Sequence, residues 1–390
     1  MTADSPSTPS IASWARRLGG SWPLAWAVAA ALAAVGARLA IFKLATQPPF
    51  IDFLTLWTGG RIANAEPGRL YDFAAIDRAQ AWLLGAAAHD RPFPYPPSTL
   101  LVFGPLGRLP FWTASAVWMT LTVAAYGFVA LRLAPRRRLL AAALIAVLPG
   151  AVWAALSGQC AFLVGALAIG AMTLFDRRPL LAGVLLGLAA AFKPTVLLMA
   201  PVALAAGGYW KTMIAAGVAG LAAITLSVLS YGAQPWLDWL KTAPAYLAHI
   251  TSNPRFYTSI ITPMGLAAQL RLKGWALTGW RMGFAVAGVA LAALIFRRPL
   301  PLAPRLTALF GASLLASPYA MNYETVLLAP GAVLALMTAP GDRARILALC
   351  AYIALAVAGF PVVSAAALLI FLTLSLGPIL LRPSGLAPPP

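Results

Sequence analysis

The chain has 390 residues, of which 61% are hydrophobic and only 10% charged, and its mean hydropathy is +0.83. This balance excludes a soluble domain, because too little polar surface remains to face water. The formal net charge is +18, but many Arg and Lys residues fall in short gaps between apolar segments, where they indicate cytoplasmic loops and not nucleic-acid binding.

The first apolar segment, roughly residues 22–45, predicts a membrane-spanning helix. Arg16 and Arg17 precede it, and the chain before them lacks a cleavable signal. We therefore expect residues 1–21 to form a cytoplasmic segment and the span to remain uncleaved. Two prolines, Pro48 and Pro49, stop this helix, so residues 46–96 follow as a loop on the outer side.

Two stretches within residues 46–96 carry apolar side chains at helical spacing. Phe53 and Trp57 belong to the first stretch, Phe73 and Ile76 belong to the second, and the turn at 66–68 separates them. Both stretches predict amphipathic helices that lie at the membrane surface.

The later apolar segments can be ordered by requiring every basic cluster to be cytoplasmic. This rule gives further spans at roughly 111–132, 139–155, 159–175, 179–193, 194–207, 212–231, 275–296, 303–317, 322–339, 346–362 and 364–381. The result is an all-α polytopic membrane protein with about twelve transmembrane helices. Residues 232–273 form a second outer loop. Segments 98–107 and 179–207 are short for crossing, and the proline-rich tail 383–390 is expected to be disordered.

Asp52 is the first candidate catalytic residue, because it follows the prolines that end the first span. A carboxylate on a rigid backbone at the membrane surface is suited to act as a general base. The alternative is structural, with Asp52 capping the helix that follows it.

Glu324 is the second candidate, because a carboxylate at the end of a span is costly and usually functional. It can instead pair with a buried arginine such as Arg38 or Arg281. Lys193, at the end of another apolar segment, either reaches the membrane surface or meets a phosphate. Arg255 lies on the same predicted side.

Several short motifs together resemble a known family. They are Asp52-Phe53 through Trp57, Gly60-Arg61, Tyr71-Asp72, Tyr95-Pro96-Pro97, Pro105-Leu106, Gly158-Gln159, Asp176-Arg177-Arg178-Pro179, Lys193-Pro194 and Ser317-Pro318-Tyr319. In this order, over roughly residues 50–330, they are similar to glycosyltransferase family 87. Its members use polyprenol-phosphate sugars and include relatives of the mycobacterial phosphatidylinositol mannoside mannosyltransferases.

The resemblance implies a GT-C-like bundle over residues 22–382 with its active site at the outer face. It implies Asp52 as catalytic base, with Lys193, Arg61 or Arg255 stabilising the leaving lipid phosphate. The residues expected to bind substrate are Arg61, Tyr71, Asp72, Tyr95, Gln159, Lys193, Arg255, Tyr319 and Asn322. Some relatives carry a His where this chain has Asn322-Tyr323-Glu324, which leaves the acceptor open.

The implied activity is hexosyl transfer, with mannose the first candidate, from a polyprenyl-phosphate sugar to a lipid or glycan acceptor in a bacterial inner membrane. A lipid-phosphate donor carries no nucleotide diphosphate, so we expect neither a metal nor another cofactor. The main alternative is a lipid-linked sugar flippase, which needs polar residues lining a path through the bilayer. Acidic residues instead gather on one predicted side, which favours an enzyme at the membrane surface.

Overall fold

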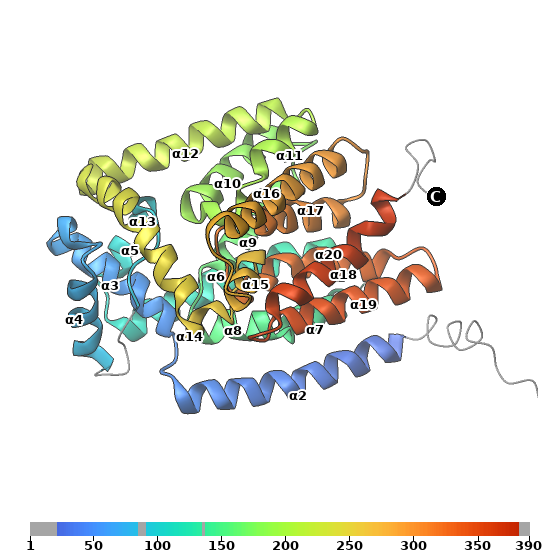
Figure 1. Cartoon of the computed structure of the whole chain (residues 1–390), viewed down its shortest axis with the longest axis horizontal. Helices are drawn as coiled ribbons and strands as arrows, with labels where there is room; N and C mark the ends of the chain where they lie inside the picture. The colour runs from blue at the N-terminus through green and yellow to red at the C-terminus, as the bar shows by residue number, and fades with distance from the viewer. Residues whose placement is uncertain (1–21, 85–90, 135–136, 382–390) are drawn as a thin grey trace, which may run out of the picture.

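The computed structural model describes residues 22–84, 91–134 and 137–381 (Figure 1). The described residues are helical and contain no strand; Ile260 and Met321 form one isolated β-bridge. The predicted cytoplasmic segment 1–21 and the predicted disordered tail 383–390 lie outside the described residues. The membrane character predicted from the composition is confirmed by the long apolar helices.

Four helices are long and apolar enough to cross a membrane. They are α2 (Trp22–Thr46), α6 (Phe111–Leu133), α12 (Trp210–Tyr231) and α16 (Gly274–Phe296). A fifth span is possible if α7 (Arg138–Ala146) and α8 (Pro149–Ser157) count as one, but they meet at a bend of 70°. Pro149 opens α8, and its ring and missing N–H break the continuous helix that residues 139–155 predict.

The prediction of about twelve spans is not confirmed by the described residues. The remaining apolar helices have fewer than the roughly twenty residues that a crossing needs. They are α9 (Ala161–Met172), α10 (Pro179–Phe192), α11 (Ala200–Ala206), α17 (Leu302–Ala316), α18 (Thr325–Thr338), α19 (Asp342–Ala358) and α20 (Ser364–Leu380). Helices α9, α17 and α18 are buried along most of their length and form the interior of the bundle, whereas α10, α19 and α20 each also expose apolar side chains. Helices α2 and α12 lie at the edge of the bundle (Figure 1), and most of their apolar side chains are exposed.

Small residues allow close helix packing in this bundle. A Cβ added to Gly187 of α10 would come within 2.3 Å of the Ala216 carbonyl oxygen of α12, and one on Gly183 within 2.4 Å of the Thr212 carbonyl oxygen. Only glycine fits such contacts, which are typical of helix pairs in membranes. The pair α10 and α12 therefore forms one tightly packed wall of the bundle.

Residues 51–84 and 91–106 form a helical cap at one end of the bundle. Helices α3 (Ile51–Ala65) and α4 (Phe73–Leu84) occupy both places where the spacing predicts helices, with η1 (Pro67–Arg69) at the turn. Helix α3 is buried on nearly all sides, so it packs within the protein. After it come η3 (Pro97–Thr99) and α5 (Leu100–Leu106), which packs against α3.

The second predicted outer loop reaches the same end. It contains α13 (Gln234–Ser252), α14 (Pro254–Tyr257) and α15 (Pro263–Gln269), and Figure 1 shows α13 beside α3, α4 and α5 at the left of the view. Helices α2 and α12 both run to this end. The two segments predicted to share one side of the membrane thus share one end of the bundle; which side this is stays a prediction.

Candidate active site

A cavity of about 270 Å³ opens at this end and is called the Asp52 cavity below. Its walls come from the end of α2, the start of α3, the extended segment 91–95, α8, α13, α14 and the chain before α18. The lining residues are Lys43, Gln47, Asp52, Thr55, Arg91, Pro92, Pro94, Tyr95, Trp153, Ser157, Gln159, Tyr246, Ile250, Arg255, Phe256, Ser259, Met321, Asn322, Tyr323 and Pro361.

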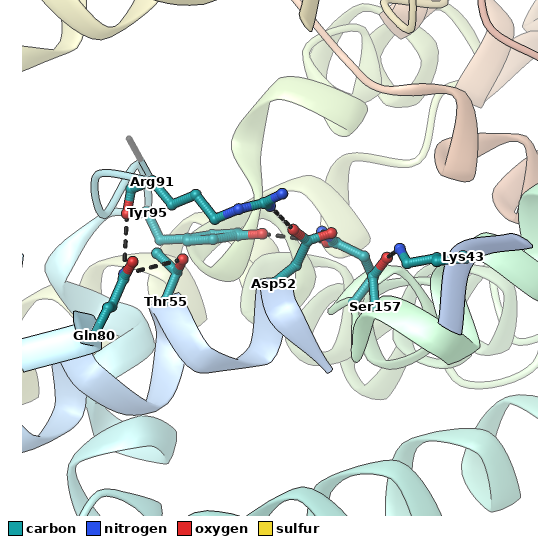
Figure 2. Close-up of polar contacts among 8 residues, drawn as sticks. Lys43, Asp52, Thr55, Gln80, Arg91, Tyr95 and Ser157 are labelled. Carbon is teal, nitrogen blue, oxygen red and sulfur yellow. Dashed lines mark hydrogen bonds and ion pairs between the residues drawn. The ribbon is translucent and has the colours of Figure 1, made fainter. Parts of the chain in front are cut away.

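Asp52 points into this cavity and is held by two side chains (Figure 2). Its Oδ1 accepts a hydrogen bond from Arg91 Nη1 at 2.7 Å, and its Oδ2 accepts one from Gln159 Nε2 at 2.8 Å. Helix α3 begins at Ile51 after Phe50, and no side chain caps it. The alternative in which Asp52 serves as the helix cap is therefore wrong.

The backbone before Asp52 is fixed to the bundle. Phe50 has a left-handed backbone with φ of 58°, which is uncommon for a bulky residue, and its N–H donates to the Leu156 carbonyl at 2.8 Å. Phe53 is fully buried, with its ring centroid 6.2 Å from those of Phe103 and Trp118. The carboxylate of Asp52 thus stands on a helix whose start and buried face are both anchored.

Arg91 is a site residue that the sequence analysis missed. Its carbonyl accepts a hydrogen bond from Gln80 Nε2 at 3.1 Å, and the same amide lies 3.4 Å from Thr55 Oγ1 (Figure 2). Gln80 is fully buried on α4. A signal was present, because an arginine directly before the proline-rich run 92–97 has a restricted backbone, but its partner lies 39 residues away.

Tyr95 and Gln159, which belong to two separate motifs, lie next to each other in the cavity wall. The Tyr95 hydroxyl lies 3.3 Å from Gln159 Oε1, and the Cys160 thiol lies 3.5 Å from that hydroxyl. Tyr71 stands behind the wall, and its hydroxyl donates to the Tyr95 carbonyl at 2.6 Å. Burial raises the pKa of both tyrosines, so both hydroxyls stay protonated and can donate.

Glu324 and Lys193 form a buried ion pair with each other. This corrects the expectation that Glu324 pairs with Arg38 or Arg281. The Lys193 ammonium also lies 5.7 Å from the Tyr95 ring centroid and 5.5 Å from that of Tyr323. Neither member of the pair lines the Asp52 cavity; the two residues lie behind the tyrosines that do.

Asn322 and Arg255 both line the cavity. The Asn322 side chain donates to the Gly359 carbonyl at 2.8 Å, which fixes it against the chain after α19. Arg255 is exposed on α14 and has no carboxylate within 4 Å among the described residues. Tyr319 is outside the cavity, packed against Tyr246 with ring centroids 5.5 Å apart.

Arg61 and Asp72, like Tyr71, Lys193 and Tyr319, are predicted substrate-binding residues that do not line the cavity. Arg61 lies 5.0 Å from the centroid of the Trp57 ring on the opposite part of α3 from Asp52. Asp72 caps α4, accepting the Ala74 and Ala75 N–H groups at 3.0 and 3.2 Å. These N–H bonds hold the pKa of the Asp72 carboxyl below its usual value. Motif order alone does not tell which face of a helix a residue occupies.

The charge of the Asp52 cavity favours an anionic ligand. Lys43, Arg91 and Arg255 supply three cations and Asp52 is the one carboxylate among the lining residues. Among the described residues, no three His, Cys, Asp or Glu side chains gather as a metal site would require. The fold and the cavity therefore define a helical membrane protein with a cation-rich pocket at one end that contains a single carboxylate among its lining residues.

Comparison with known proteins specifies this class. The sequence profile named glycosyltransferase family 87 matches residues 93–318, more than half of the chain. The chain belongs to glycosyltransferase family 87, which confirms the resemblance that the motifs indicate. Membership of an enzyme family also disfavours the flippase alternative.

Two curated relatives are similar over shorter stretches. Both are named polyprenol-phosphate-mannose-dependent alpha-(1-2)-phosphatidylinositol pentamannoside mannosyltransferase. The Mycobacterium tuberculosis protein is 37% identical over 97 residues, covering 24% of this chain and 21% of the relative. The Mycolicibacterium smegmatis protein is 38% identical over 81 residues, covering 20% and 18%. The chain thus spans about a fifth of the length of these relatives. No solved structure matches it.

Proposed function

We propose that the protein transfers a hexose from a polyprenyl-phosphate sugar to a hydroxyl of a lipid or glycan acceptor at the outer face of a bacterial plasma membrane. The names of both relatives make mannose the first candidate sugar. The observation that carries the proposal is the Asp52 carboxylate in a cation-rich cavity at one end of the bundle.

Asp52 is proposed as the general base. Its carboxylate takes the proton of the acceptor hydroxyl as that oxygen forms a bond to the anomeric carbon of the donor. The bond between the anomeric carbon and the phosphate oxygen breaks, and its electron pair stays on the phosphate. The products are the glycosylated acceptor and a polyprenyl phosphate, and the proton on Asp52 passes to water.

The arrangement around Asp52 supports distinct roles for its neighbours. Arg91 and Gln159 orient the carboxylate, because each holds one of its oxygens. Tyr95 and Asn322 line the cavity where the sugar would bind, and Arg255 is placed to meet negative charge at the cavity wall. Tyr71 and Tyr319 support this wall from behind.

Glu324 is better suited to a supporting role than to proton transfer. Its ion pair with Lys193 is buried behind Tyr95 and Tyr323, away from the cavity lining. Glu324 neutralises the charge of Lys193, and Arg61 does not line the cavity. We therefore do not propose Lys193 or Arg61 as the cation that stabilises the leaving phosphate.

A transfer assay with purified protein tests the proposal. The protein would be incubated with a membrane-lipid extract and polyprenyl-phosphate mannose, glucose or arabinose carrying a labelled sugar, each with and without EDTA. We expect EDTA-resistant transfer from the mannose donor to an extractable acceptor. Absence of transfer from all three donors, together with donor translocation by the protein in sealed vesicles, would contradict the proposal and favour a flippase.

A further inference from the structure

One buried cation in the first membrane helix has no role so far. Lys43 lies near the end of α2, and its side chain is only 4% exposed. Arg38, one turn earlier on α2, is exposed. Lys43 therefore does not reach out to the membrane surface as a lysine at a helix end often does; it turns toward the bundle.

The ammonium of Lys43 makes two contacts, both with α8. Its Nζ donates a hydrogen bond to Ser157 Oγ and lies 4.8 Å from the centroid of the Trp153 ring. Among the described residues no carboxylate lies within 4 Å of it. An ammonium has three donors, and a buried charge without a counter-ion is costly. The carboxyl ends of α2 and α8 offset part of this cost.

The unmet donors of Lys43 have an open space beside them. Lys43, Trp153 and Ser157 all line the Asp52 cavity. The charge of Asp52 acts on Lys43 through space, but Asp52 makes no ion pair with Lys43 within 4 Å, and Arg91 and Gln159 hold its two oxygens. In Figure 2, Ser157 and Lys43 lie on the side of Asp52 away from Arg91. The cavity therefore has a separate cationic pole on the α2 side.

The surroundings of this pole fit an anion with a lipid tail. The neighbouring residues Ile41, Phe42 and Leu44 of α2 are exposed by 69%, 62% and 51%. Large exposed apolar side chains on a membrane helix face lipid. A molecule bound here can keep its hydrocarbon chain along α2 while its head group enters the cavity.

We propose that Lys43 and Ser157 form the binding site for the phosphate of a polyprenyl phosphate, the part of the donor that leaves. The inference rests on the proposed function, which requires such a phosphate, and it adds the residues that hold it and the side of the cavity from which the lipid enters. Lys43 is then a ligand-binding residue whose counter-ion is the substrate.

Thermal unfolding of the purified full chain in detergent tests this site. A short-chain polyprenyl phosphate would be titrated into wild type, Lys43→Met, Lys43→Gln and Lys43→Arg, with Lys211→Met as the control. Lys211 is an exposed lysine at the start of α12, far from the cavity. Inorganic phosphate and phosphatidylglycerol serve as the two other anion sources.

We expect polyprenyl phosphate to raise the unfolding temperature of wild type and Lys211→Met equally. Lys43→Met and Lys43→Gln should need roughly ten to a hundred times more ligand for the same shift, and Lys43→Arg should lose less. Without ligand, Lys43→Met should be at least as stable as wild type, because it removes an unpaired buried charge.

Three results would overturn the site. The first is an unchanged ligand response in Lys43→Met or Lys43→Gln. The Gln variant is included in case Lys43→Met does not fold, because its amide can keep the hydrogen bond to Ser157. The second is a ligand-free loss of stability in both variants with the ligand response intact, which would make Lys43 a structural tie between α2 and α8. The third is an equal response to inorganic phosphate or phosphatidylglycerol. If wild type itself does not respond to polyprenyl phosphate, the proposed function fails together with the site. A wild-type response that persists unchanged in the Lys43 variants overturns the site alone.

Discussion

The geometry of Asp52 depends on side chains that are distant in sequence. Both of its oxygens carry a hydrogen bond, from Arg91 at 2.7 Å and from Gln159 at 2.8 Å. Charge-assisted bonds of this kind fix a carboxylate strongly. A carboxylate held in one orientation can accept a proton only along the remaining lone pairs, so its partners decide where an acceptor hydroxyl must lie.

Replacing Arg91 by Gln should therefore lower turnover. We expect a loss of about ten- to a hundredfold, because misplacement of a catalytic group by about 1 Å has effects of that size. Arg78→Gln, an exposed arginine on neighbouring α4, should leave the rate unchanged. The measurement is the initial rate of sugar transfer at saturating donor. Wild-type turnover in Arg91→Gln would show that the ion pair does not orient the base.

The sequence predicts some of these side chains and misses others for a physical reason. Asp52 is predictable because prolines and the end of an apolar span mark its position. Gln159 and Tyr95 follow from motif order, which resembles the family. Arg91 was missed because the proline run after it marks only a restricted backbone, whereas its pairing with Asp52 is a tertiary contact between residues 39 positions apart. For the same reason the motif order did not show that Arg61 packs at Trp57, outside the cavity lining.

Close packing between α3 and α5 sets the position of the helix that carries Asp52. A Cβ on Gly60 would lie 1.9 Å from the Phe103 carbonyl oxygen and 2.5 Å from its carbonyl carbon. These are backbone atoms, so no side-chain rotation relieves the clash. Gly60 is thus required by the approach of two helices.

Gly60→Ala should lower both stability and activity. Overpacking typically costs about 1–3 kcal/mol, and the shift of α3 moves Asp52. Gly68→Ala is the matched control, because a Cβ at Gly68 meets nothing within 4 Å. Thermal unfolding and transfer rate would be measured for both variants. A Gly60→Ala protein as stable as Gly68→Ala would contradict the packing described for α3 and α5.

Long helices are predicted well and short ones poorly. The spans predicted at roughly 22–45, 111–132 and 212–231 correspond to α2, α6 and α12 within two residues at each end. The stretch 139–155 is instead two helices, because Pro149 breaks it. Hydrophobicity reports that a segment is buried in membrane or protein, but it does not distinguish a crossing helix from a short buried one.

The arrangement of the whole bundle agrees with the order of its basic clusters. Two of these clusters contact helices at the end opposite the Asp52 cavity, where Arg298 donates to the Ile379 carbonyl at 2.7 Å and Arg305 bonds the Tyr209 hydroxyl. The positive-inside rule then predicts that this end is cytoplasmic and that the cavity opens outside.

Cysteine labelling in intact cells tests this orientation. In a Cys350→Ser background, which removes the exposed thiol and leaves buried Cys160, we expect Arg78→Cys and Lys241→Cys to react with an impermeant maleimide. Lys211→Cys and Arg297→Cys should react only after permeabilisation. The reverse pattern would place the cavity in the cytoplasm, and a mixed pattern would contradict the common end of the two predicted outer loops.

The most direct test of the catalytic role of this cavity is the single-turnover rate of sugar transfer by Asp52→Asn beside wild type and Glu66→Gln. Glu66 is a solvent-exposed acid at the end of α3, 61% exposed. We predict a loss of about 10²–10⁴-fold for Asp52→Asn, with unchanged folding and with donor still bound, and a normal rate for Glu66→Gln. Wild-type transfer by Asp52→Asn would remove Asp52 from the mechanism.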